Sequence, residues 1–281
     1  MFDRIEDPPK IEVSHVGVTY RTKSRQDVAA IDDVSLTVAS NEFIALIGPS
    51  GCGKSTLLNI LAGFVVPTAG VARIDGEQIA GPSIERGYVF QEFALFPWKT
   101  VQQNVEFGLK TRGLSKQARS TAALRYLELV GLSSFAGSYP RELSGGMRQR
   151  VAIARAYAPE PEILLMDEPF GNLDALSRGE MQIELRDLSR RDRKTVVMVT
   201  HSVEEAIALA DRIVVLTRRP AATRAVIQVA GVIDEDEKGH RETKSPEFLR
   251  MKEEVLAMAH EELSAQSRRS MSREIELHAG A

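Results

Sequence analysis

The sequence predicts an α/β protein with a mixed or parallel core sheet, an N-terminal antiparallel β region and an inserted helical region. Three observations predict this class. The glycine-rich segment Gly48–Ser55 follows a continuous apolar run and precedes a helical pattern. Between about residues 92 and 157 helical patterns prevail. After that block, apolar runs again alternate with helical patterns, as expected of strands and helices that share one sheet.

The N-terminal part predicts strands, because β-branched and polar residues alternate there. The apolar run Phe43–Ile47 lacks such alternation and predicts a strand that is buried on both faces. A helix is expected from Ser55 to Ala62, where Gly63 ends it. The other strands of this part are expected at residues 11–20, 34–38 and 71–75, the last followed by a hairpin turn.

The middle of the chain carries helix start signals. Thr100 and Gln103 form a predicted capping box, and Ser115 is a predicted cap for a second helix that runs to about Val130. Asp174 precedes a long helix, and Ser202 with Glu205 predicts another capping box. Buried strands are expected between these helices, at residues 163–166, 195–199 and 213–216.

The C-terminal part gives weaker signals. A short strand is expected at 225–229 and a helix from Ser245-Pro246 to about 265, followed by a frayed tail over 266–281. We therefore expect one main domain at 10–217, with the helical subdomain at about 92–157 inserted in it. Residues 218–281 form a short C-terminal extension in this interpretation.

Composition limits the classes of function. The 281 residues carry a net charge of −3, with 43% hydrophobic and 27% charged residues, as in ordinary globular proteins. This charge gives no support for nucleic acid as a partner. No apolar run approaches the roughly 20 residues of a membrane span, and the start lacks a secretory layout. With a single cysteine, Cys52, no intrachain disulfide can form, so we expect a cytosolic protein.

The segment Gly48-Pro-Ser-Gly-Cys-Gly-Lys-Ser55 predicts a nucleotide phosphate site. Its glycines expose backbone N–H groups in front of a helix N-terminus. Lys54 offers a charge to the β- and γ-phosphates, and Ser55 offers a hydroxyl to Mg²⁺. We expect no catalytic role for Cys52. The candidate nucleotide-binding residues of this segment are Gly48, Pro49, Ser50, Gly51, Cys52, Gly53, Lys54, Ser55 and Thr56.

Two carboxylates, Asp167 and Glu168, follow the predicted buried strand at 163–166. A carboxylate there can hold Mg²⁺ through water, while its neighbour can polarise the water that attacks the γ-phosphate. Acid pairs at strand ends are common, but together with the phosphate segment this pair predicts hydrolysis of a nucleotide.

Residues 141–150 read Arg-Glu-Leu-Ser-Gly-Gly-Met-Arg-Gln-Arg, between the phosphate segment and the acid pair. With this motif, roughly residues 10–217 resemble the ATPase subunit of an ATP-binding-cassette (ABC) transporter, a P-loop NTPase cassette that uses ATP and Mg²⁺. The resemblance implies that Ser144, Gly145 and Gly146 close on the γ-phosphate held by a second subunit, so that hydrolysis needs a homodimer. The family more often has glutamine at the position of Met147.

The same resemblance assigns roles to four further residues. Gln91 matches the glutamine that senses Mg²⁺ and the attacking water, and His201 matches the histidine that contacts the γ-phosphate and holds Glu168. Asp174 matches the aspartate that couples the two sites of the dimer, although it can also cap its own helix. Tyr20 matches the aromatic residue that stacks on adenine, and a purely structural tyrosine is the alternative. Asn172 departs from the alanine or serine that the family often has there.

Several segments resemble the nitrate, taurine and aliphatic-sulfonate importer group, namely Phe96–Gly108, Val151–Ala156 and Arg218–Pro220. This resemblance implies an importer of a small oxyanion-type solute. The aromatic residues near Trp98 would receive an integral membrane permease, or else pack within the helical region. A solute-binding protein is an indirect partner, and the chain is placed at the cytoplasmic face of the inner membrane, peripheral through the permease. The alternatives are an importer for another substrate, a non-transport cassette or a regulatory module without turnover.

Overall fold

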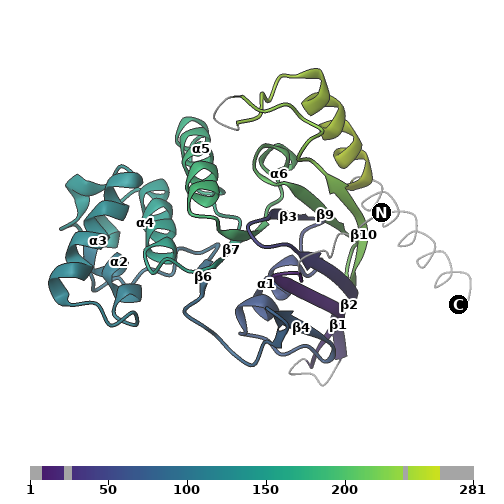
Figure 1. The fold of residues 1–281 in the computed structure, drawn as a ribbon, viewed down its shortest axis with the longest axis horizontal. Helices are drawn as coiled ribbons and strands as arrows, with labels where there is room; N and C mark the ends of the chain where they lie inside the picture. The colour runs from purple at the N-terminus through teal and green to yellow at the C-terminus, as the bar shows by residue number, and fades with distance from the viewer. Residues whose placement is uncertain (1–7, 22–26, 237–239, 260–281) are drawn as a thin grey trace, which may run out of the picture.

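A computed structural model describes residues 8–21, 27–236 and 240–259 (Figure 1). One ten-stranded sheet runs through the molecule in the order β5-β4-β1-β2-β10-β9-β3-β8-β7-β6. Neighbouring strands from β9 to β6 are parallel, whereas β1, β2, β4 and β5 pair in antiparallel fashion. The mixed sheet with an antiparallel N-terminal part was predicted from the sequence and is confirmed.

The strand bounds agree with most of the predicted ranges. The strands are β1 Ile11–Arg21, β2 Asp27–Val38, β3 Phe43–Ile47, β4 Ala69–Ile74, β5 Glu77–Gln78, β6 Arg86–Val89, β7 Ile163–Asp167, β8 Thr195–Val199, β9 Arg212–Leu216 and β10 Ala221–Gln228. Two strands begin well before their predicted ranges. β2 begins at Asp27, because its first residues pair with the end of β1 although they lack an alternating pattern.

β10 begins at Ala221, four residues before the predicted strand. A turn closed by Thr217 explains this start: the Thr217 N–H donates to the Ala222 carbonyl over 2.9 Å, and the Ala222 N–H donates to the Thr217 hydroxyl, also over 2.9 Å. β10 then lies between β2 and β9 and joins the antiparallel part of the sheet to the parallel part.

Side chains of the central strands alternate between two cores, one on each face of the sheet. On β3, Ala45 belongs to the core that contains the helical region, and Leu46 to the core that contains α1 (Lys54–Ala62). Every residue of β3, β7 and β8 is buried. The continuous apolar runs were therefore interpreted correctly as strands buried on both faces.

The helical region is inserted between β6 and β7, and Figure 1 shows it at one end of the sheet. It contains α2 (Val101–Leu109), α3 (Lys116–Leu129) and α4 (Gly145–Tyr157), with short 3-10 turns at Ser133–Phe135 and Pro140–Glu142. The capping box of Thr100 and the cap by Ser115 are both present. No helix in the described part of the chain is both long and apolar enough to cross a membrane.

The two helices that follow the acid pair are α5 (Ala175–Arg191) and α6 (Val203–Leu209). Asp174 and Ser202 cap them as predicted, but the capping box of Ser202 is only half formed. The Glu205 side chain accepts a hydrogen bond from the Thr200 hydroxyl at 2.6 Å, and the Ser202 N–H donates to that hydroxyl at 3.0 Å. Glu205 is thus buried beneath the turn that precedes α6.

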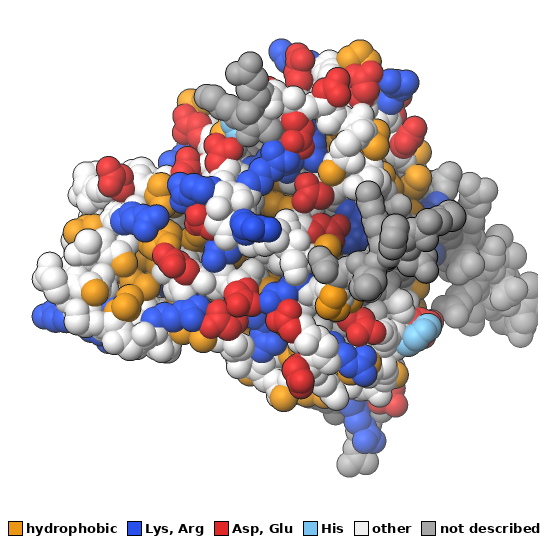
Figure 2. All heavy atoms as spheres, viewed as in Figure 1, with side chains coloured by type: hydrophobic (Ala, Val, Ile, Leu, Met, Phe, Trp, Pro, Cys, Tyr) orange, Lys and Arg blue, Asp and Glu red, His pale blue; other side chains and the backbone are white. Residues whose placement is uncertain are grey.

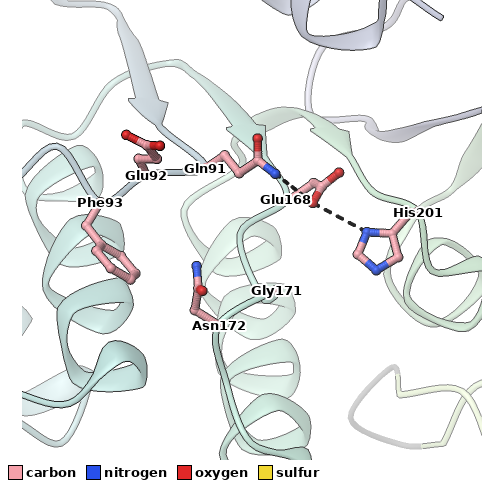
Figure 3. Close-up of a pocket in the computed structure, with 7 residues that line it drawn as sticks. All are labelled: Gln91, Glu92, Phe93, Glu168, Gly171, Asn172 and His201. Atoms are coloured by element: carbon pink, nitrogen blue, oxygen red, sulfur yellow. Dashed lines mark hydrogen bonds and ion pairs between the residues drawn. The ribbon is translucent and has the colours of Figure 1, made fainter. Parts of the chain in front are cut away.

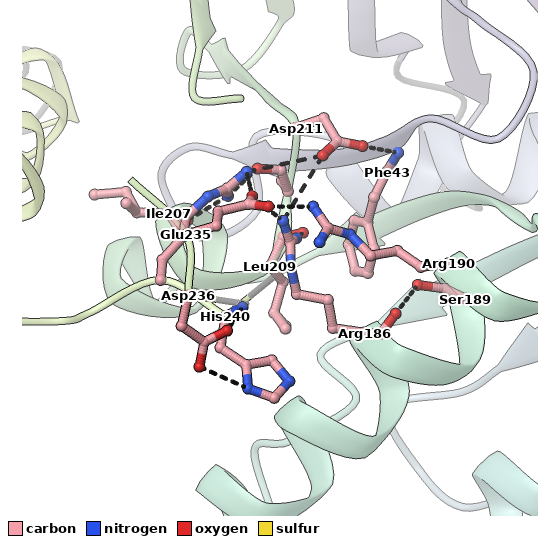
Figure 4. A network of polar contacts seen from close by, with 12 residues as sticks. Phe43, Arg186, Ser189, Arg190, Ile207, Leu209, Asp211, Glu235, Asp236 and His240 are labelled. Carbon is pink, nitrogen blue, oxygen red and sulfur yellow. Dashed lines mark hydrogen bonds and ion pairs between the residues drawn. The ribbon is translucent and has the colours of Figure 1, made fainter. Parts of the chain in front are cut away.

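Residues 246–259 form the predicted C-terminal helix, whose Phe248, Met251 and Val255 are buried in the same core as α6. The segment before it is fixed by a buried polar network (Figure 4). Arg241 forms an ion pair with Glu235 at 3.0 Å and donates a hydrogen bond to the Ile207 carbonyl at 2.8 Å. The predicted helix end near 265 and the predicted tail at 266–281 lie outside the described residues.

Candidate functional site

The phosphate segment forms the connection between β3 and α1. Gly53 precedes α1 with a φ of 119°, a conformation that L side chains rarely adopt. A Cβ atom at Gly53 would lie 2.8 Å from the Ala30 carbonyl oxygen, so only glycine fits. Gly51 has a φ of 72° and nothing within 4 Å of an added Cβ, so the loop is open at that point. The backbone of the loop can therefore approach a ligand closely.

Lys54 lies along this loop. Its ammonium group donates hydrogen bonds to the carbonyls of Gly48 at 2.7 Å and Pro49 at 3.0 Å. The Cys52 side chain is buried behind the loop, and burial raises the pKa of its thiol despite the opposing charge of Lys54. A buried thiol of raised pKa is a poor nucleophile, which agrees with the expectation of no catalytic role for Cys52.

A hollow of about 450 Å³ in front of the loop brings together most of the predicted nucleotide residues. Tyr20 lies at its rim with 41% of its surface exposed, which leaves the ring free to meet a planar ligand. Arg219, for which sequence reasoning proposed no site role, also lines this hollow. The full lining is Tyr20, Ala30, Ser50, Gly51, Gly53, Lys54, Ser55, Thr56, Gln91, Glu168 and Arg219.

Asp167 ends β7 and is buried, with 8% of its surface exposed. Burial raises the pKa of its carboxyl, and a hydrogen bond from the Ser55 hydroxyl opposes that rise. The fold therefore brings Ser55 near Asp167, although 112 positions separate them in the sequence. Both are oxygen donors of the kind that Mg²⁺ prefers.

Glu168 follows in a left-handed backbone conformation with a φ of 48°, and its N–H donates to the Val199 carbonyl at 2.9 Å. Gln91 donates a hydrogen bond from Nε2 to Glu168 Oε2 at 3.1 Å. His201 Nδ1 lies 3.4 Å from the same oxygen. Figure 3 shows the amide and the imidazole on opposite sides of this carboxylate. Glu168 is thus oriented by Gln91, which follows β6, and by His201, which follows β8.

A second hollow, of about 620 Å³, opens beside this carboxylate. Its lining residues are Gln91, Glu92, Phe93, Glu168, Gly171, Asn172 and His201 (Figure 3). In the described residues, no group of three or more His, Cys, Asp or Glu side chains could hold a metal ion by itself. A site with few protein oxygens fits Mg²⁺ that arrives with phosphate and water as its remaining ligands.

Glu205 belongs to this centre and was assigned only a capping role from the sequence. Burial raises the pKa of its carboxyl, and the hydrogen bond from the Thr200 hydroxyl opposes that rise. Thr200 comes directly before His201, so Glu205 fixes the turn that carries the histidine. A glutamate three residues after a helix cap is the usual partner of that cap, which is why the sequence pattern concealed its burial.

The Ser144-Gly145-Gly146 motif begins α4 next to Asn172, whose carbonyl oxygen lies within 4 Å of Cβ positions built on Gly145 and Gly146. Ser144 caps α4 and accepts a hydrogen bond from the Met147 N–H at 3.2 Å. Ser144 is exposed, and it lines neither of the two hollows described above. Asp174 is exposed as well and caps α5, where the Ser177 N–H lowers the pKa of its carboxyl. The fold therefore gathers the phosphate loop, Asp167, Glu168, Gln91, His201 and Tyr20, whereas Ser144 lies outside both hollows.

Comparison with known proteins gives concordant results. The sequence profile of the family described as "ABC transporter" matches residues 31–171. The chain is 46% identical over 236 residues to an uncharacterised ABC transporter ATP-binding protein of Methanocaldococcus jannaschii, which covers 84% of this chain and 86% of that protein. It is 45% identical to the nitrate import ATP-binding protein NrtD of Synechocystis sp., over 83% of this chain and 89% of that protein.

The taurine import ATP-binding protein TauB of Rhizobium johnstonii is 44% identical over 89% of this chain and 96% of its own length. Among solved structures, a dimeric ATP-binding cassette in a post-hydrolysis state, bound to ADP and Pi, superimposes with a TM-score of 0.73 at 34% identity. The match covers 79% of this chain and 99% of that cassette. These likenesses confirm the predicted P-loop cassette fold.

Proposed function

Since this chain belongs to the ABC transporter family and is an ATPase of that family, we propose that it is the ATP-hydrolysing subunit of an importer. The observation that carries the proposal is that Glu168 and Gln91 share one hollow with the phosphate loop, that His201 lies 3.4 Å from Glu168, and that Ser144 lines neither this hollow nor the second one. One chain thus holds the catalytic half of a site and a separate anion-binding helix end.

ATP is bound by the loop and α1. The loop N–H groups and the N-terminal end of α1 hold the phosphates, and Lys54 exchanges its loop carbonyls for the β- and γ-phosphate oxygens. Tyr20 stacks on the adenine at the rim of the hollow. Ser55, Asp167 and Gln91 would hold Mg²⁺, which when bound neutralises charge on the β- and γ-phosphates.

Glu168 accepts the proton of the attacking water. Gln91 and His201 fix the carboxylate on the side that faces the second hollow, where a water can lie in line with the γ-phosphate. The proton passes from the water to Glu168 as the oxygen attacks phosphorus and the bond to the leaving oxygen of ADP breaks. Glu205 holds the His201 turn in place during this step.

The Ser144 end of α4 completes the site of a second copy. Its exposed N–H groups and the helix dipole attract a γ-phosphate, and the glycines leave space for it. ATP would thus close a homodimer with two composite sites, and Asp174 lies beside this surface to couple them. The dimeric cassettes among the structural neighbours support this arrangement.

The transported solute is proposed from the relatives. Nitrate and taurine import proteins match almost the whole chain, which supports a small oxyanion-type solute, such as nitrate, taurine or an aliphatic sulfonate. An aromatic patch suits docking of a membrane permease: the Phe96 ring lies 5.7 Å from that of Trp98 and 4.6 Å from that of Phe107. Trp98 is 71% exposed.

The other partner predictions follow from this assignment. A solute-binding protein acts through the permease, which holds the chain at the cytoplasmic face of the inner membrane. Acidic and basic side chains are interspersed over the face seen in Figure 2, so that face offers nucleic acid no basic surface.

The mass of purified Glu168→Gln, measured by light scattering with and without ATP and Mg²⁺, tests the proposal. Glutamine keeps the shape of the side chain but cannot accept the proton, so ATP should stay bound and the mass should double. Ser144→Arg in the same background is the control and should remain monomeric. A monomeric Glu168→Gln that binds ATP in equilibrium dialysis would contradict the composite site.

The importer assignment is tested separately. Proteoliposomes are prepared with the permease encoded beside this chain, its binding protein and ATP. Uptake of labelled nitrate, taurine or an alkanesulfonate is the expected result, and Glu168→Gln should abolish it. ATP-dependent uptake of an unrelated solute alone would replace the proposed substrate class.

A further inference from the structure

Arg155 is a half-buried cation in the last turn of α4. Its Nη1 donates a hydrogen bond to the Ala94 carbonyl at 2.6 Å, and its Nη2 donates to the Phe93 carbonyl at 3.1 Å. The guanidinium carbon also lies 5.9 Å from the centre of the Phe96 ring. Within the described residues, no carboxylate pairs with Arg155, and burial lowers its pKa. Its only polar contacts there are thus backbone carbonyls of one short segment.

That segment is strained at the point of contact. Ala94 has a φ of 48°, the left-handed conformation that residues other than glycine rarely adopt. Neither a buried cation without a counter-ion nor a strained alanine favours folding. The two features occur together because the arginine holds the carbonyls that this backbone conformation presents.

The same segment leads back to the catalytic carboxylate. Gln91, three residues before Ala94, donates its amide hydrogen bond to Glu168. Phe93 is held a second time by α4, because the Arg148 guanidinium lies 5.2 Å from the centre of its ring. Two arginines of α4 therefore hold the chain immediately after Gln91, and Ser144 begins the same helix.

We propose that Arg155 is a positioning residue that makes α4 and the Gln91–Ala94 segment move as one body. This inference rests on the proposed function, in which Ser144 binds the γ-phosphate held by a second copy and α4 moves as a result. Movement of α4 toward the γ-phosphate of the partner then moves Gln91 relative to Glu168. The two sites of the dimer are thereby coupled. When the Ser144 end of α4 binds the γ-phosphate of the partner, the Arg155 end shifts Gln91 and so sets its contact with Glu168 in the same chain.

Arg112 provides a matched control, because it ties the helical region to the sheet without touching this segment. Its Nε donates to the Pro159 carbonyl at 2.8 Å, and its two terminal nitrogens bind Glu85 at 2.7 and 2.9 Å. Loss of Arg112 removes at least as many hydrogen bonds from the same joint as loss of Arg155 does. A merely structural role of Arg155 would therefore be mimicked by Arg112→Gln.

Trp98 is the only tryptophan, and it reports on the segment directly. Its ring lies 5.7 Å from that of Phe96, which in turn lies against Arg155. In the Glu168→Gln background, ATP with Mg²⁺ should change the Trp98 emission. Arg155→Gln should abolish that change while the Kd for ATP stays within about twofold, because the phosphate loop is untouched. Arg155→Lys, which keeps the charge, should restore part of it, and Arg112→Gln should keep it.

Steady-state kinetics give a second measurement in the chain with Glu168 intact. Arg155→Gln should lower kcat by up to about tenfold with little change in KM, as expected for a misplaced Gln91. Arg155→Lys should recover part of the rate, and thermal unfolding verifies that each variant is folded. Three results would each overturn the inference. The first is a full change in Trp98 emission in folded Arg155→Gln, and the second is no change in the Glu168→Gln parent. The third is a loss of the change in Arg112→Gln equal to that in Arg155→Gln. Light scattering of the parent sample separates these results from a failure of the composite site itself.

Discussion

Two clusters of charged side chains border the same helices but differ in how completely they pair. In the C-terminal network, Arg186 and Arg190 each contact Glu235 at 2.6 Å (Figure 4). Arg241 forms a third ion pair with Glu235, at 3.0 Å. In the catalytic cluster, Glu168 faces a hollow and has an amide and an imidazole beside it (Figure 3), and the carboxylate of Asp167 precedes it in the chain.

The difference shows how a structural cluster is told from a functional one. Opposite charges in direct contact satisfy one another and bury their groups, as the 0% exposure of the Arg241 side chain shows. Like charges beside open space are not neutralised by the protein, so a ligand of opposite charge can bind there. Substitutions should therefore affect stability in the first cluster and turnover in the second.

Glu168→Gln should give the largest difference between the effect on turnover and the effect on stability. We expect phosphate release at saturating ATP to fall by about 10²- to 10⁴-fold, because the general base is lost. The free energy of unfolding in urea should change by no more than about 0.5 kcal/mol, because the side chain makes only two contacts. Activity above about a tenth of the parent rate would assign the proton to another group.

Arg241→Met should give the reverse pattern. Loss of the buried cation leaves Glu235 and two backbone carbonyls with fewer partners, so the free energy of unfolding should fall by about 3–5 kcal/mol. Activity per folded molecule should be unchanged. Arg250→Met is the matched control on the C-terminal helix: its side chain is 70% exposed, so a change within about 0.5 kcal/mol is expected. Equal effects of the two substitutions would contradict the comparison.

The contribution of Glu235 should depend on pH in a defined direction. Burial alone would raise the pKa of this carboxyl, but the hydrogen bond from Arg190 and the charges of Arg186 and Arg241 outweigh it and lower the pKa below 4.5. The stabilisation is therefore complete above pH 4.5 and is lost as the pH falls through the folded-state pKa. Urea unfolding should show Glu235→Gln about 2 kcal/mol less stable at pH 7, with the difference shrinking as the pH falls below 4.5. A gap that widens on acidification would refute the pairing.

Gln91→Ala should give the smallest effect on turnover. It is also the sharpest test of the comparison, because it removes a single hydrogen bond from the catalytic cluster. The amide makes one hydrogen bond to Glu168, so its loss should lower kcat by about tenfold, which corresponds to about 1.4 kcal/mol. Stability should be unchanged, whereas removal of one hydrogen bond from the C-terminal network should lower it. Gln103→Ala, in the capping box of α2, controls for a glutamine whose role is structural and should leave kcat unchanged.

Much of this architecture could be predicted from the sequence because the decisive signals are local. A buried strand before a glycine loop fixes where Lys54 and Ser55 lie, and the strand end fixes Asp167. Helix caps such as Thr100 and Ser144 bond to backbone groups only three residues away, so they can be identified from neighbouring residues. The mixed sheet and its antiparallel N-terminal part were predicted from the same patterns.

Features that depend on distant contacts could not be predicted in this way. The start of β2 is fixed by pairing with β1, and β10 takes its place between β2 and β9. The burial of Glu205 depends on Thr200 rather than on the cap that its spacing suggested. Arg155 gives no sequence signal at all, because its partners are backbone carbonyls about 60 positions away.

The distance between Ser144 and the phosphate loop of its own chain has a genetic consequence. In the proposed dimer, every site combines the loop of one copy with the motif of the other. A mixed pair of Lys54→Ala and Ser144→Arg chains would therefore carry both lesions in one site and neither in the second. Two alleles that are each inactive alone should complement each other when they are expressed in one cell, and the mixed dimer should turn over with a single working site.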